Sequence, residues 1–214
     1  MGLLNKQTFI CLDCEMTGLD LELDRIIEIA VVKFTFDEIL EEYETLIDPE
    51  CIIPQLTIDI HHITQEMVAG KPTIATVLPK LLEMIGKHIV VGHGVNFDLA
   101  LIGKAADRAG IPHTLLSNRF FDTLRMARLY GESPTNSLEQ LRKHFNIEEE
   151  GAHRAMSDVI VNMGVFKYLS KSYKTTDQLF EILSRPVLLK AMPLGKHKGR
   201  PMKEIPVEYL RWAV

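Results

Sequence analysis

The segment FICLDCEMTG, residues 9–18, joins a strongly apolar start to two acidic residues one position apart. Residues i and i+2 of a strand point to the same face, so the carboxylates of Asp13 and Glu15 are neighbours. Carboxylates so placed repel, and burying either one as an unpaired anion is costly. The first arginine, Arg25, comes only after three further acids, so the local chain supplies no counter-charge. The segment therefore predicts a bound divalent cation with more oxygen ligands elsewhere.

The size and composition of the chain indicate an ordinary globular protein. Its 214 residues fit one medium domain with an appendage and can bury a core. No apolar run approaches the roughly 18 residues of a membrane span, and the N-terminus lacks a signal-peptide pattern, so we expect a cytoplasmic protein without membrane contact. Three cysteines argue against a disulfide framework. Cys11 and Cys14 are three positions apart on a predicted strand, which places them on opposite faces as buried, reduced thiols.

The charge of the chain is unevenly distributed. Residues 190–214 hold six Lys or Arg and two acids, a net charge of +4, whereas the remainder holds 18 basic and 27 acidic residues, a net charge of −9. An acidic body is not typical of a generic nucleic-acid binder. An acidic site that holds cations can nevertheless accept a phosphate substrate, because the metals reverse the local sign.

The order of predicted elements indicates an α/β domain. Three strand-like segments come first, and strands alternate with helices afterwards, which is typical of a mixed sheet. Residues 57–68 are predicted to be a loop running into a short helix. The predicted strands are 8–14, 26–36, 39–48, 88–93 and 119–123, and the predicted helices are 74–85, 96–109, 122–131, 137–145, 154–170, 175–184 and 206–212.

Further acids follow later strands. Asp98 lies near the start of a helix that follows a strand, where it serves either the helix dipole or a metal site. His153 and Asp158 are about 140° apart on one ideal helix, so they converge only if His153 precedes the helix. Together with Asp13 and Glu15, Asp98 and Asp158 form an all-oxygen set suited to Mg²⁺ or Mn²⁺. His153 would then be the group that exchanges a proton near neutral pH.

Three motifs carry a family resemblance. They are Asp13-x-Glu15 with Thr17-Gly18, then Asn96-Phe97-Asp98, then His153-x-Ala155-x-x-Asp158. In this order they resemble the DEDDh group of 3′–5′ exonucleases, above all the bacterial proofreading epsilon subunit of DNA polymerase III and its stand-alone relatives. The resemblance covers roughly residues 7–170.

The resemblance implies an RNase H-like fold: a mixed five-stranded sheet flanked by helices, here with a small C-terminal extension. It also implies that Asp13, Glu15, Asp98 and Asp158 hold two Mg²⁺ or Mn²⁺ ions and that His153 is the general base. We expect stepwise hydrolysis of phosphodiesters at 3′ ends.

The resemblance also implies substrate contacts. Family members place the residues matching Thr17-Gly18, His61 and Phe97 near the terminal nucleotide, although packing roles for Thr17, His61 and Phe97 stay open. The segment IHHIT, residues 60–64, is similar to a family segment that usually has glycine where this chain has His62. The chain also has Gly92-His93-Gly94 where the family often has Ala-His-Asn. Both departures leave the substrate preference open.

The implied function is removal of nucleotides from 3′ ends of single-stranded DNA in proofreading or repair, with a DNA polymerase subunit as a candidate partner. One alternative is an RNA-trimming exoribonuclease of the same family. Another is a non-catalytic module that binds nucleic acid or a polymerase. Residues 177–183 faintly echo a sliding-clamp peptide, but the helical spacing of Leu179, Phe180 and Leu183 favours core packing.

We expect two units, an exonuclease domain over 1–172 and a helix with a basic extension over 173–214. Residues 192–214 resemble a small Gly- and Lys-rich module appended to some bacterial exonucleases. Gly195 and Gly199 with Lys196, Lys198 and Arg200 either grip phosphate or form a solvated loop before a short helix. The chain ends inside that predicted helix, which suggests a truncated or incomplete module.

Overall fold

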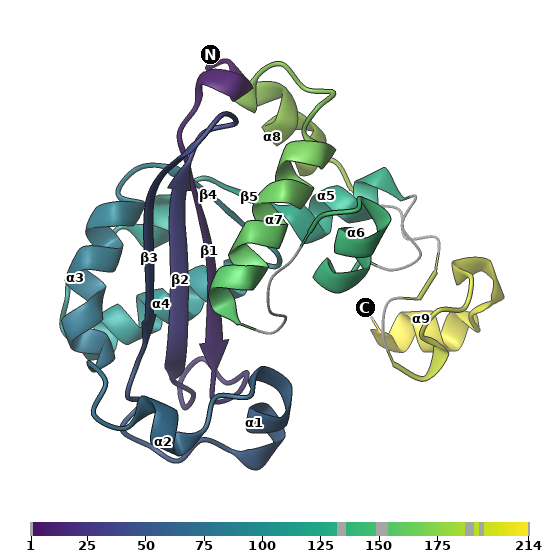
Figure 1. The fold of residues 1–214 in the computed structure, drawn as a ribbon. Coiled ribbons are helices and arrows are strands. Elements are labelled where there is room, and N and C mark those ends of the chain that lie inside the picture. The colour runs from purple at the N-terminus through teal and green to yellow at the C-terminus, as the bar shows by residue number, and fades with distance from the viewer. Residues whose placement is uncertain (1, 132–135, 149–153, 187–190, 193–194, 214) are drawn as a thin grey trace.

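The computed structural model describes residues 2–131, 136–148, 154–186, 191–192 and 195–213. Within these residues the chain forms a five-stranded sheet of order β3-β2-β1-β4-β5. The first three strands are antiparallel, and β1 pairs with β4, and β4 with β5, in parallel. The predicted mixed five-stranded sheet is therefore confirmed (Figure 1). The strands are β1 Phe9–Met16, β2 Ile26–Phe34, β3 Ile39–Leu46, β4 Ile89–Gly92 and β5 Phe120–Asp122.

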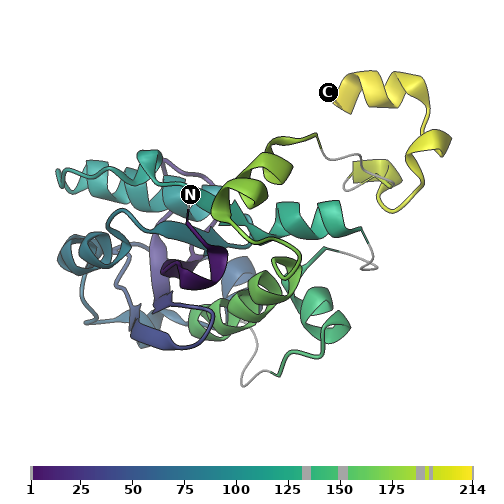
Figure 2. The same cartoon turned by 90° about the horizontal axis from the view of Figure 1, so that it is seen from above.

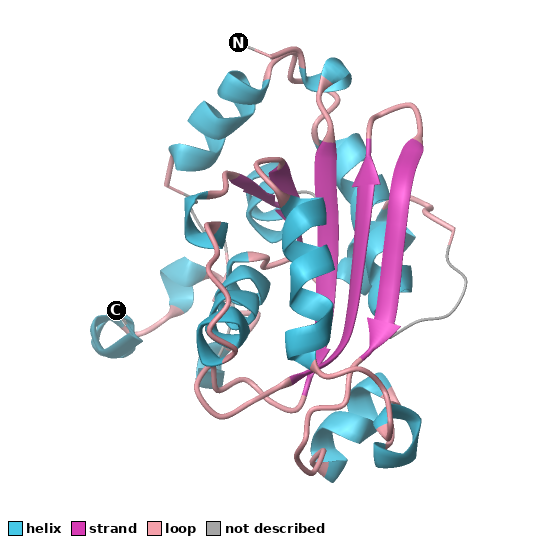
Figure 3. Cartoon of the chain, turned by 90° about the vertical axis from the view of Figure 1, so that its left-hand side faces the viewer, coloured by secondary structure: helices cyan, strands magenta, loops and turns pink. Residues whose placement is uncertain are grey.

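Helices cover both faces of this sheet (Figure 3). The α-helices are α1 Gln55–His61, α2 Gln65–Val68, α3 Ile74–Ile85, α4 Asn96–Arg108, α5 Thr123–Tyr130, α6 Leu138–His144, α7 Ala155–Leu169, α8 Thr176–Ser184 and α9 Val207–Ala213. Short 3₁₀ helices are η1 Leu4–Lys6, η2 Leu115–Ser117, η3 Gly195–His197 and η4 Met202–Glu204.

The alternation of side chains along β1 divides the core into two halves. Ile10, Leu12 and Cys14 face the half that α3 and α4 close. Phe9 and Cys11 face the half that α7 and α8 close, where the ring of Phe9 lies 5.1 Å from that of Phe166. Cys11 and Cys14 are thus buried, free and on opposite faces, as the strand period predicts.

The segment between β3 and α3 differs from the prediction. Residues 57–61 were expected in a loop, but Gln55–His61 forms α1, and His62 ends it in the left-handed conformation. Ile58 of α1 packs against a small cluster of buried residues that holds Ile53, Ile63 and Val68. This burial stabilises a helix too short to persist by itself. Pro54 precedes the helix as its N-cap, in an extended conformation.

The two C-terminal segments of the chain, α8 and residues 195–213, pack differently. Leu179 of α8 is buried in the core, and the ring of Phe180 lies 4.2 Å from that of Phe121, so the core interpretation of residues 177–183 is correct. Residues 195–213, in contrast, stand apart from the sheet and its helices (Figure 2). Among the described residues no helix combines the length and apolar character needed to cross a membrane.

Candidate active site

The C-terminal half of β1 carries two acids past the point where its parallel neighbour stops. The pairing of β1 with β4 covers only Phe9–Cys11, whereas the pairing with β2 continues to the end of the strand. Asp13 and Glu15 therefore lie at an open edge on the β4 side, and Glu15 is opposite Glu28 of β2. The backbone of β1 beside these two acids thus has no neighbouring strand on the β4 side.

A third carboxylate comes from α7, which begins beside this half of β1 (Figure 1). Asp158 stands in the first turn of α7, and its backbone N–H donates to the carbonyl of Arg154 at 3.1 Å. One carboxylate oxygen from each of Asp13, Glu15 and Asp158 lies within 4.8 Å of the others, and all three residues are half-buried. The fold therefore brings together acids that are 145 positions apart in the sequence.

The electrostatics of this cluster oppose its ionisation. Burial and the negative charges of Asp98, Asp158 and Glu15 raise the pKa of Asp13 well above its ordinary value. Burial, followed by the charges of Asp158 and Glu28, raises the pKa of Glu15 to about 8. Without a cation the cluster would thus hold protons at neutral pH.

The donor set fits a hard divalent cation. The three clustered groups are all carboxylates, and oxygen ligands are those that Mg²⁺ and Mn²⁺ prefer. A cation among them would remove the repulsion that raises their pKa values. The cluster can therefore hold a metal ion.

Asp98 lies in the first turn of α4 and is 7 % exposed. Burial raises the pKa of Asp98 to about 7, while the neighbouring amide and thiol of Cys14 act in the opposite direction. After burial, the charge of Asp98 is the largest contribution to the raised pKa of Asp13. Asp98 therefore lies close to the acidic cluster and to Cys14 of β1.

An ion pair with a fully buried carboxylate anchors the start of α7. Glu28 is 0 % exposed, and the Arg154 Nε atom lies 2.9 and 3.1 Å from its two carboxylate oxygens. The Arg154 Nη2 atom and the backbone N–H of Ala155 donate to the same carboxylate. The pair ties β2 to the helix turn that carries Asp158.

His61 is buried at the end of α1 with an unused donor. It is 2 % exposed, and its Nδ1 atom accepts a hydrogen bond from the N–H of Ile63 at 3.0 Å. Its proton is therefore on Nε2, which has no hydrogen-bond partner among the described residues. Burial lowers the pKa of His61, and the nearby charge of Glu28 opposes that shift. The hydrogen bond from Ile63 thus favours the imidazole form that carries its proton on Nε2.

Thr17 lies where β1 leaves the sheet, and its hydroxyl is already engaged. Thr17 Oγ1 donates to Asp24 Oδ1 at 2.7 Å and accepts from the N–H of Arg25 at 3.0 Å. A side chain at Gly18 would collide with the carboxylate of Asp24, so this turn requires glycine. Both residues therefore shape the connection from β1 to β2.

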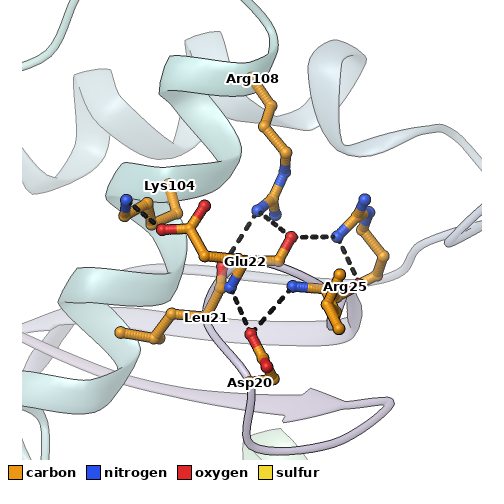
Figure 4. A network of polar contacts seen from close by, with 7 residues as sticks. Asp20, Leu21, Glu22, Arg25, Lys104 and Arg108 are labelled. Carbon is orange, nitrogen blue, oxygen red and sulfur yellow. Dashed lines mark hydrogen bonds and ion pairs between the residues drawn. The ribbon is translucent and has the colours of Figure 1, made fainter.

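An ion pair and a hydrogen bond hold the connection between β1 and β2 against α4 (Figure 4). Lys104 forms an ion pair with Glu22, and Arg108 donates to the carbonyl of Leu21 at 3.1 Å. Within the connection, Asp20 Oδ1 accepts from the N–H of Glu22 at 2.8 Å. The turn after β1 is thus fixed to the helix that carries Asp98.

Phe97 and His153 are the other two predicted site residues. Phe97, the second residue of α4, is half-buried and packs against the core. His153 lies outside the described residues, directly before Arg154.

The sequence patterns did not identify Glu28, Arg154 or Cys14 as residues of the site. The signal for Glu28 was of the same kind as that for Asp13, namely one acid inside an apolar strand, IIEIAVVKF. An acid in such a strand needs a partner, and here the partner is 126 positions away. That distance explains why local patterns did not reveal it.

Comparison with known proteins identifies the family. A model described as "Exonuclease" matches residues 10–166. The chain belongs to this exonuclease family. It is 34 % identical over 160 residues to the DNA polymerase III subunit epsilon of Aquifex aeolicus, an alignment that covers 74 % of this chain and 78 % of that subunit. The PolC-type DNA polymerase III of Clostridium perfringens is 34 % identical over 175 residues, 81 % of this chain but only 12 % of that polymerase.

Solved structures in this exonuclease class share the fold. Exonuclease X in complex with 5′-overhanging duplex DNA superposes with a TM-score of 0.63 at 25 % identity, covering 82 % of this chain and 99 % of that chain. Escherichia coli exonuclease I in complex with a dA16 oligonucleotide gives 0.71 at 23 % identity, over 83 % of this chain and 43 % of that chain. The expected exonuclease fold is thus confirmed. A second model, described as "Putative quorum-sensing-regulated virulence factor", matches residues 179–214.

Proposed function

We propose that the chain is a metal-dependent 3′–5′ exonuclease that releases nucleotides from the 3′ ends of single-stranded DNA. The observation that carries this proposal is the convergence of Asp13, Glu15 and Asp158 within 4.8 Å in a member of the exonuclease family. The similarity to the Aquifex aeolicus epsilon subunit supports a role in proofreading or repair, with a DNA polymerase subunit as partner.

In this proposal two Mg²⁺ or Mn²⁺ ions are held by Asp13, Glu15 and Asp158, with Asp98 as the fourth acid. When bound, such ions lower the pKa of water and stabilise negative charge on phosphoryl oxygens. The charge of Asp98 raises the pKa of Asp13, which supports its place beside the same ions.

His153 would accept the proton of the attacking water as the general base. The water oxygen bonds to phosphorus, the bond from phosphorus to the 3′ oxygen breaks, and that oxygen takes up a proton. The products are a nucleoside 5′-monophosphate and a strand that is shorter by one nucleotide. The reaction is a hydrolysis and needs no other co-substrate.

The Nε2–H of His61, which has no hydrogen-bond partner among the described residues, supports a substrate contact. A buried donor without a partner costs free energy, and a substrate oxygen that accepted its hydrogen bond would remove that cost. The hydroxyl of Thr17 already makes two hydrogen bonds, so we assign Thr17 and Gly18 the role of shaping the turn beside the substrate. Phe97 would pack beside the terminal nucleotide with its exposed part.

The test is a polarity assay on one oligonucleotide labelled at either end. With Mg²⁺, the 5′-labelled strand should give a ladder of shortened products, and the 3′-labelled strand should release labelled mononucleotide at once. EDTA and Asp13→Asn should stop both reactions, whereas Asp37→Asn, an exposed acid in the turn between β2 and β3, should not. Mononucleotide release from the 5′ end, or full activity of Asp13→Asn, would refute the proposal. A matched RNA strand measures the preference between DNA and RNA.

A further inference from the structure

The described C-terminal residues concentrate positive charge and exposed aromatic surface. Lys196, Lys198, Arg200 and Arg211 are all exposed. Trp212, the single tryptophan of the chain, is 77 % exposed. The rest of the protein is acidic, so this charge is not a general property of the surface.

Specific contacts join these residues into one surface. The backbone N–H of Lys196 donates to the hydroxyl of Tyr209 at 3.2 Å. The ring of His197 lies edge-on to that of Tyr209, with centroids 4.6 Å apart, and Trp212 follows at 5.4 Å from Tyr209. The basic turn 195–200 and α9 are therefore held together through Tyr209, whose ring contacts the half-buried His197 on one side and the exposed Trp212 on the other.

The turn itself is built to make this contact. Gly195 has φ +73°, and a side chain there would collide with the hydroxyl of Tyr209. The N–H of Gly199 donates to the carbonyl of Met192 at 2.8 Å, and Ala191 pairs with Pro201. Hydrogen bonds of the backbone and close packing thus fix the turn. Its two lysines, Lys196 and Lys198, are exposed to solvent.

Contacting aromatic rings beside exposed cations favour one class of partner, a single-stranded nucleic acid. Bases of a single strand stack on exposed rings, and Lys and Arg side chains bind the phosphates between them. An acidic peptide would satisfy the charges but not the exposed indole. We propose that residues 195–212 form an accessory binding site for single-stranded DNA. The choice of DNA as the strand rests on the proposed function, while the site itself is separate from the acidic cluster.

Fluorescence anisotropy of the 214-residue chain with a labelled dT20 strand tests this site. EDTA prevents hydrolysis and removes the cations through which the acidic cluster would bind phosphate, so the binding measured reports the C-terminal surface. Trp212→Ala should raise Kd about tenfold or more, the effect of losing one stacked base, and Trp212→Phe should retain part of the binding. Because Trp212 is exposed, neither change should unfold the protein.

The cations are tested by the salt dependence of the same binding. The double variant Lys196→Gln/Lys198→Gln should reduce the slope of log K against log salt by about 1.4, since each phosphate contact on a single strand contributes about 0.7. The matched control is Lys171→Gln/Lys174→Gln, which removes two exposed lysines elsewhere. Unchanged binding in the Trp212 and Lys196/Lys198 variants, or an equal loss in the control, would overturn the proposal.

A short substrate separates this proposal from the proposed function. Hydrolysis of a thymidine 5′-phosphate nitrophenyl ester with Mn²⁺ requires only the acidic site, so the C-terminal variants should keep their kcat and KM for it. On a long strand the same variants should show a raised KM with unchanged kcat. A chain that binds dT20 through residues 195–212 but hydrolyses neither substrate would refute only the proposed function. Binding of a U20 strand without binding of dT20 would overturn the assignment to DNA.

Discussion

Arg154 and Glu28 form a bidentate ion pair that joins β2 to the start of α7. Glu28 is fully buried, whereas the side chain of Arg154 is 42 % exposed. The carboxylate also accepts from the N–H of Ala155, so it fixes the helix start by two routes. This arrangement sets the position of Asp158, which lies four residues after Arg154.

The ion pair predicts an unequal effect of removing its two partners. Arg154→Met leaves a buried carboxylate with one backbone donor, and we expect a loss of about 2–3 kcal/mol in the free energy of unfolding. Glu28→Gln should cost less, because its amide oxygen still accepts from Ala155 and the arginine can turn to water. Urea denaturation measures both, and Arg185→Met, which breaks an exposed pair with Glu181, is the control. A larger loss for Glu28→Gln would contradict this account.

The acidic cluster predicts that metal-free protein loses stability as pH rises. In the folded chain the pKa of Glu15 is raised to about 8 and that of Asp98 to about 7, from ordinary values of 4.5 and 3.8. A raised folded pKa favours the folded state below the ordinary pKa, and this contribution is lost as pH rises through the folded pKa. Thermal unfolding in EDTA should therefore show a Tm that falls by several degrees between pH 5 and pH 8.

The same cluster predicts the pH dependence of stabilisation by Mg²⁺. Millimolar Mg²⁺ should raise Tm more at pH 8 than at pH 5, because protons compete with the cation at the lower pH. Asp13→Asn should abolish most of this difference, and Asp37→Asn should preserve it. An equal Mg²⁺ effect at both pH values would show that the cation binds elsewhere.

The buried imidazole of His61 predicts a substrate effect without a metal effect. His61→Asn keeps an oxygen near the position of Nδ1, where the N–H of Ile63 donates, and removes the Nε2 donor. We expect KM for a DNA strand to rise about tenfold, the equivalent of one hydrogen bond to a charged oxygen. The Mg²⁺ concentration for half-maximal rate should not change. Wild-type KM in His61→Asn would remove His61 from the substrate site.

Because the hydroxyl of Thr17 already makes two hydrogen bonds, we expect its removal to lower the stability of the protein. Thr17→Val keeps the shape of the side chain but removes the partner of the Arg25 N–H and of the Asp24 Oδ1 atom. We expect a loss of about 1–3 kcal/mol in the free energy of unfolding, measured by urea denaturation. Thr17→Ser, which keeps the hydroxyl, should be close to wild type. If Thr17→Val unfolds like wild type but its KM rises, the hydroxyl acts on the substrate instead.

The periodic features of the sequence determined the sheet and nearly all of its helices. Each strand and each helix from α3 onward begins and ends within two residues of its predicted bounds. The spacing of Asp13 and Glu15 also indicated adjacent carboxylates, since the side-chain period of a strand is a local property of the backbone.

Only the tertiary structure decided how each polar group is satisfied. It placed Arg154 on Glu28, brought Asp98 close to Asp13 and gave the hydroxyl of Thr17 two hydrogen bonds. Among the described residues it left the Nε2–H of His61 without a partner. It also made α1 a helix through burial of Ile58. These outcomes depend on contacts between segments that are far apart in the chain or on packing around a turn. Local sequence patterns carry backbone periodicity, but the partner of a buried charge is fixed only when the whole chain has packed around it.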